Sequence, residues 1–153
     1  MKLILFNIIL ILAAGSPAFA SPAPPPDPVD VVFGDFQRKM LPMFEDLVTT
    51  LKARVPRPLH PRLPLILKSI EENLEGMRDH VVPSIQEGFA QRKKIEELAE
   101  LFDRLMLYLM QFHDGVDKFV IWAVAKKELT IDERLFNDLQ DLWAHIRYYK
   151  VRF

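Results

Sequence analysis

The sequence predicts an all-α fold, an antiparallel bundle of four or five helices joined by short loops. Apolar residues recur at steps of three and four through most of the chain, and no stretch alternates with period two for long enough to suggest a strand. The segment from Leu98 to Ala125 holds the helical period longest and is apolar over most of its circumference. Such a helix must be covered on several sides, so it is expected to be central, with Leu105 and Leu109 fully buried.

The N-terminus has the pattern of a secretory signal peptide. Lys2 precedes a short apolar run, Leu3 to Ala14, and Ala18-Phe19-Ala20 supplies the small residues that favour cleavage after Ala20. A membrane anchor is the alternative, but this run is shorter than the ~20 residues that span a bilayer. We therefore expect a signal peptide over residues 1–20, no transmembrane segment, and a secreted, extracellular protein.

The rest of the chain divides into a leader and one domain. Residues 21–28 are rich in proline and have little to bury, which is typical of an exposed spacer and also of a ligand for an aromatic groove. Residues 29–153 form a single helical-bundle domain. Its first helix is expected to have Asp27 as its N-cap and Pro28 at its first position.

Composition excludes several classes of protein. The chain has no cysteine, which removes disulfides, thiol catalysis and zinc–thiolate sites. Its formal net charge of −1 does not indicate a nucleic-acid partner. A disulfide-free domain of this length must depend on the burial of its apolar residues, which make up 50% of the sequence.

The first two helices are expected to be limited by prolines. The first runs to about Arg54 and contains Pro42, which should kink it or end a short first piece because proline lacks a donor. The second runs from Leu63 or Pro64 to about His80, and Pro83 is expected to end it.

The boundaries of the later helices follow from caps and apolar stripes. Ser84 and Glu87 make a capping box for a helix whose stripe continues to Leu98, across a polar patch at residues 91–94. The central helix is expected to be continuous through Gly115, because the apolar residues on either side stay in phase. A second capping box, Thr130 to Glu133, is expected to start the last helix.

The end of the last helix leaves two alternatives open. Its inner stripe runs from Leu135 to Tyr149, with Phe136 and Trp143 beside it. Tyr148, Tyr149 and Phe153 either extend this helix into a dimer contact or fold back onto the bundle.

The segment 52–68 is the most unusual in composition. It contains five Lys or Arg residues, four prolines and no acid. One interpretation is a rigid basic loop that meets an anionic partner, such as a membrane headgroup, a sulfated glycan or an acidic protein face. The other is a solvated connection stiffened by proline. The candidate contact residues are Lys52, Arg54, Arg57, His60 and Arg62.

The sequence offers little for catalysis. His113 with Asp117, and Asp141 with His145, are i,i+4 pairs that would make a metal site if they were brought together, but exposed ion pairs on helix faces are the expected outcome. No Glu-x-x-His, Gly-x-Ser-x-Gly or glycine-rich phosphate loop occurs in the sequence. We expect no enzyme activity, no cofactor and no metal.

Two non-enzymatic functions remain. The first is a secreted protein that binds a protein partner through its surface, of a hormone-like, immune-modulating or effector type. The alternative is an extracellular carrier or surface-binding protein for lipid or another apolar ligand. The phenylalanine and methionine content of the predicted helices suits a ligand cavity and a dry core equally well.

Overall fold

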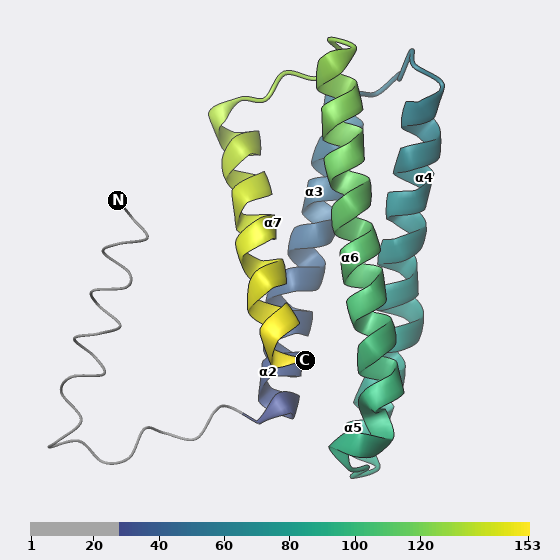
Figure 1. Cartoon of the computed structure of the whole chain (residues 1–153), viewed down its shortest axis with the longest axis vertical. Coiled ribbons are helices and arrows are strands. Elements are labelled where there is room, and N and C mark those ends of the chain that lie inside the picture. The colour runs from purple at the N-terminus through teal and green to yellow at the C-terminus, as the bar shows by residue number, and fades with distance from the viewer. Residues whose placement is uncertain (1–27) are drawn as a thin grey trace, which may run out of the picture.

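The computed structural model describes residues 28–153, and Figure 1 shows them as an antiparallel bundle of four long helical segments. The predicted helical bundle is confirmed, and no strand occurs among residues 28–153. No helix in that range is long and apolar enough to span a membrane. The predicted signal peptide, the leader up to residue 27 and the Asp27 cap lie outside the described residues.

The first segment stays helical past Pro42. It consists of α2 (Val29–Asp35), the π-helical turn η2 (Phe36–Met40) and α3 (Leu41–Arg54). Pro28 directly precedes α2, and its carbonyl accepts the N–H groups of Val31 and Val32. Pro42 does not end the helix, because a π-helical turn immediately before it changes the hydrogen-bond pattern where proline would clash.

The second segment shows the same arrangement at Pro83. It consists of α4 (Arg62–Glu75), the π-helical turn η3 (Gly76–Val81) and α5 (Val82–Ala90). The prediction that Pro83 ends the helix is wrong. Ser84 is not an N-cap either, because its hydroxyl donates to the carbonyl of His80, one turn earlier in the same helix.

The chain turns instead at residues 91–94, where we predicted a continuous helix. The N–H of Arg92 donates to the Phe89 carbonyl and the N–H of Lys93 to the Gly88 carbonyl, at 3.0 Å each. These two bonds form a Schellman motif, which closes the end of α5. The motif requires a left-handed residue, and Arg92 takes that role with φ of 55°. The usual sequence signal, a glycine, is absent, so this helix end was missed.

The central helix α6 (Ile95–Ala125) is continuous through Gly115, as predicted. At its start the Glu97 carboxylate accepts the N–H of Lys94 at 2.8 Å. A second Schellman motif ends it, with Lys127 left-handed at φ of 59° and the N–H of Glu128 donating to the Ala123 carbonyl.

The last helix, α7 (Glu133–Arg152), begins at a different cap from the predicted one. Asp132, and not Thr130, is the N-cap, and its Oδ1 accepts the Leu135 N–H at 2.8 Å. At the other end, Tyr149 is buried and Phe153 folds back, with its ring centroid 5.7 Å from that of Phe36 and 5.2 Å from that of Phe102.

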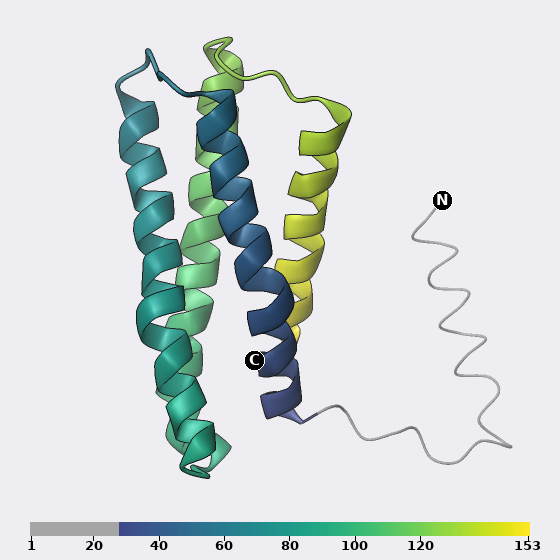
Figure 2. The ribbon, with the colours of Figure 1, turned by 180° about the vertical axis from the view of Figure 1, so that it is seen from behind.

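Successive segments lie side by side around the bundle. The helix α6 faces the viewer in Figure 1 and α3 does so in Figure 2, with α4 and α7 at the two sides in both views. The connections 55–61 and 126–132 lie at one end of the bundle, and the turn 91–94 lies at the other. The first end therefore brings together two loops that are distant in sequence.

The core is filled by side chains from all four segments. Leu105 and Leu109 are fully buried, as predicted, and the Phe44 and Phe112 rings lie 4.5 Å apart between centroids. The expectation that α6 is covered on several sides is wrong at Leu107 and Ile121, which are 57% and 65% exposed. In a four-helix bundle each helix keeps one face toward solvent, because its neighbours cover only the inner side.

Glycines allow α6 to lie close to the second segment. A Cβ atom built on Gly115 would lie 2.8 Å from Cγ1 of Ile70, and one on Gly76 would lie 2.7 Å from the Tyr108 ring. Both distances are shorter than an ordinary van der Waals contact. The two helices therefore approach to a distance at which these positions have no room for a larger residue.

Candidate functional site

The predicted contact residues lie at the end of the bundle that carries the two long connections. Lys52 and Arg54 belong to the last turn of α3, Arg57 and His60 to the connection 55–61, and Arg62 begins α4. The connection 126–132 lies beside them (Figures 1 and 2).

One carboxylate ties the two connections together. Glu128 accepts the Leu59 N–H at 2.5 Å through Oε1 and lies 3.4 Å from the His60 nitrogen through Oε2. These bonds satisfy backbone donors in a segment where prolines prevent a helix. The basic connection is therefore held in one place by the loop between α6 and α7.

Trp122 forms a platform under the same connection. The His60 ring lies 5.0 Å from the Trp122 ring between centroids, and the Arg62 guanidinium carbon lies 4.8 Å above it. The Lys126 ammonium lies 5.9 Å from the same ring. Cations near an indole face are attracted by its quadrupole, so Trp122 positions basic groups from both loops.

Two of the five predicted residues are neutralised by acids from other helices. Lys52 pairs with Glu71 at 2.9 Å, and Arg54 pairs with Asp132 at 2.8 Å. The Leu135 N–H and then the Arg54 guanidinium lower the pKa of Asp132, which keeps this acid charged. The sequence contains no acid between residues 52 and 68, but the fold supplies these two from outside that range. Lys52 and Arg54 therefore have structural partners.

Four other cations of this end have no acidic partner among the described residues. Arg57, Arg62, Lys126 and Lys127 make no ion pair with any carboxylate in the described part of the chain. Leu59 belongs to the same connection as Arg57 and is 87% exposed. We call these five residues the loop-end surface. Lys126 and Lys127 were missed as members, since the sequence showed only that they end a helix.

The sequence around the loop-end surface is basic. Residues 52–62 and 122–134 together contain seven Lys or Arg and three Asp or Glu, whereas the whole chain carries a formal net charge of −1. Charge is therefore unevenly distributed, with an excess of basic residues at this end of the bundle.

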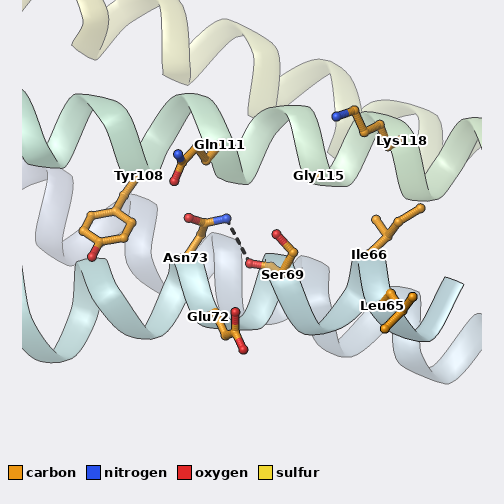
Figure 3. A pocket seen from close by; sticks show the side chains of 9 residues that line it. All are labelled: Leu65, Ile66, Ser69, Glu72, Asn73, Tyr108, Gln111, Gly115 and Lys118. Atoms are coloured by element: carbon orange, nitrogen blue, oxygen red, sulfur yellow. Dashed lines mark hydrogen bonds between the residues drawn. The ribbon is translucent and has the colours of Figure 1, made fainter. Parts of the chain in front are cut away.

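A groove lies between α4 and α6, away from the predicted residues. Figure 3 shows its polar side chains, and its volume is about 690 Å³. The Asn73 amide donates to the Ser69 carbonyl at 2.9 Å, and Gly115 of α6 also lines the groove. The lining includes the Glu72 carboxylate and the Lys118 ammonium, so the groove offers hydrogen bonds and charged groups to a small polar molecule. It is lined by Leu65, Ile66, Ser69, Glu72, Asn73, Tyr108, Gln111, Gly115 and Lys118.

The two histidine–aspartate pairs have different environments. His113 is only 6% exposed, with Nε2 3.5 Å from the Asp117 carboxylate and its ring 4.3 Å from the Trp143 ring centroid. The expectation of an exposed ion pair is therefore wrong for this pair. His145 lies 2.7 Å from the backbone carbonyl of Asp141, so the partner is not the carboxylate.

The two pairs do not combine into one metal site. Asp117 lies in a groove between α6 and α7, whereas His145 lies in another with Asp35 and Lys39. Among residues 28–153, no three His, Asp or Glu side chains are grouped so that they could hold a metal ion.

No family model matches this chain, and no curated protein or solved structure matches it either.

Proposed function

We propose that this chain is a secreted, non-enzymatic protein that binds an acidic protein partner through the loop-end surface. The observation that carries the proposal is a group of four cations that make no ion pair within the described residues, Arg57, Arg62, Lys126 and Lys127. They come from the connections 55–61 and 126–132, which Glu128 holds together, and from the first residue of α4. Secretion follows from the predicted cleavage after Ala20, outside the described residues.

The loop-end surface has features that favour binding. Proline fixes part of the backbone of the connection 55–61, and Glu128 and Trp122 hold it against the bundle. Less conformational entropy is therefore lost when a partner is bound. Arginine presents a planar fork of donors that suits carboxylates, and Arg57 is free to use it. These properties support an acidic protein face as the partner.

A lipid surface is the second candidate, because Leu59 is 87% exposed among the cations. An apolar side chain beside basic ones suits the interface of an anionic membrane. A carrier with an internal ligand cavity has less support, since rings such as those of Phe44 and Phe112 pack against each other in the interior.

The test compares two triple variants with matched charge. The first replaces Arg57, Lys126 and Lys127 by serine, and the second replaces Arg92, Lys93 and Lys94 at the opposite end. All six side chains are exposed, and each set contains one left-handed residue. Retention is measured on a polyglutamate matrix at low and physiological ionic strength, where screening acts over about 8–10 Å.

We expect the wild type and the second variant to be retained at low salt and the first variant to elute early. Equal loss in both variants would contradict the proposal, because net charge alone would then explain retention. Failure of the wild type to be retained at low salt would contradict it as well. Binding to phosphatidylserine vesicles without retention on polyglutamate would select the lipid candidate instead.

A further inference from the structure

A second surface lies along the side of the bundle, between α6 and α7, separate from the loop-end surface. It is a groove of about 460 Å³ with partly exposed apolar side chains. Ile131, Phe136 and Trp143 are 40%, 52% and 43% exposed, although large apolar residues of a solitary domain are usually better covered. The groove is lined by Asp117, Ile131, Phe136, Leu139, Gln140, Trp143 and Arg147.

The helix α6 extends this apolar surface. Ile121 and Val124 lie four and seven residues after Asp117, so the helical repeat places them on the same face of α6. They are 65% and 41% exposed. Both helices that border the groove therefore present apolar side chains to solvent.

The two helices also carry opposite charges at the groove. Asp117 belongs to α6, and the only basic side chain within 4 Å of its carboxylate in the described part of the chain is His113, whose Nε2 lies at 3.5 Å. Arg147 belongs to α7, where its guanidinium carbon lies 5.2 Å from the Trp143 ring centroid. It makes no ion pair with a carboxylate of the described residues.

We infer that a second copy of this chain covers the groove and forms a two-fold symmetric dimer. In such a dimer, one surface meets the same surface of the other copy, and each contact occurs twice. If a two-fold axis bisects the line from Asp117 to Arg147, Asp117 of one copy faces Arg147 of the other. Arg147 of the first copy then faces Asp117 of the second. An acid and a base on one face therefore make that face complementary to itself.

The composition of the groove fits this occupant. Aromatic residues and arginine are enriched in protein interfaces, and both occur here in Phe136, Trp143 and Arg147. A partner with a uniformly charged face would match only one of Asp117 and Arg147. A second copy matches both and also covers the exposed apolar residues from the other side.

Sedimentation velocity over a series of concentrations tests this inference. The variants are Asp117→Arg, Arg147→Asp and the double variant that carries both changes. Leu65→Ser is the control, because Leu65 is 69% exposed but lies on the α4 side of the bundle. Circular dichroism shows whether each variant keeps its helices.

The wild type and Leu65→Ser should dimerise with the same dissociation constant. Each single charge reversal should raise that constant by about tenfold or more, because like charges then face each other across the interface. The double variant should recover most of the loss. If Asp117→Arg fails to fold because of its contact with His113, Arg147→Asp and Phe136→Ser still decide the result.

A wild type that stays monomeric over the whole series overturns the inference. So do single variants that dimerise like the wild type, and a double variant that is no better than the single ones. None of these results depends on whether the loop-end surface binds an acidic partner.

Discussion

Asp132 performs two tasks at the start of α7. Its Oδ1 accepts the Leu135 N–H, and its Oδ2 pairs with Arg54 of α3 at 2.8 Å. The first contact caps α7 and the second joins it to the helix before the basic connection. The cap joins residues three apart in the sequence, although Thr130 was predicted in its place, whereas the pairing with Arg54 depends on the fold.

The pKa of Asp132 is therefore predicted to lie below its ordinary value, first because of the Leu135 N–H and then because of Arg54. Because folding lowers this pKa, the charged carboxylate stabilises the fold above the pKa of the unfolded chain. That stabilisation is lost as pH falls through the pKa of the folded chain. Carboxyl carbon NMR should show the lowered pKa, and Arg54→Gln should raise it only partly. Complete restoration by Arg54→Gln would mean that the cap contributes nothing.

Residues in the left-handed conformation explain the largest error in the predicted boundaries. Arg92 and Lys127 both close Schellman motifs, a position that glycine usually occupies. The sequence therefore carries no clear stop signal at residues 91–94. It carries a false one at Pro83, which the π-helical turn η3 accommodates. The residue types at 91–94 and at Pro83 can be seen in the sequence. Which of the two positions ends the helix depends on how the surrounding helices pack.

At the scale of elements, the apolar stripes were reliable. Leu105 and Leu109 are fully buried as predicted, and both ends of the inner stripe predicted for the last helix, Leu135 and Tyr149, are buried. Caps were less reliable, since Thr130 and Ser84 were each expected to start a helix and neither does. An apolar stripe is recognised from many residues over several turns, so one exceptional residue does not change the predicted helix face. A predicted cap depends on a single side chain.

The close approach of α4 and α6 predicts an unusual effect of adding one methyl group. Gly115→Ala should lower the free energy of unfolding by about 1 kcal/mol, because crowding of Ile70 outweighs the gain in helix propensity. Gly34→Ala in α2 is the matched control, since a Cβ atom there would have no neighbour within 4 Å. That variant should be more stable by up to about 1 kcal/mol.

Urea unfolding followed by circular dichroism measures both changes. If Gly115→Ala were as stabilising as Gly34→Ala, the helices would have to separate easily at Ile70, contrary to the close packing described above.

At the scale of the whole molecule, the candidate site could be predicted only in part. The composition of residues 52–68 drew attention to the correct end of the bundle. It did not show that Glu71 and Asp132 neutralise Lys52 and Arg54, or that Lys126 and Lys127 join the other cations. Contacts between segments so distant in sequence follow from the topology of the bundle, and no local pattern specifies them.

The groove between α6 and α7 could not be predicted from the sequence either. Phe136 and Trp143 were placed beside the inner stripe of the last helix, a position from which either burial or exposure could follow. Their exposure depends on how far α7 turns toward α6, and the structure leaves both partly open. The exposure of apolar residues of α6, such as Ile121, could not be predicted from the sequence, because it depends on which side of that helix has no neighbouring helix.

If the two connections form one anion-binding surface, as we propose, NMR titration should map that surface residue by residue. Polyglutamate is titrated into isotopically labelled protein at low salt, and the backbone amide shifts are followed along the chain. Shifts should be concentrated at residues 57–62 and 126–128, should decrease as salt is added, and should be absent at residues 91–94. Shifts centred on residues 91–94, or no shifts at low salt, would contradict it.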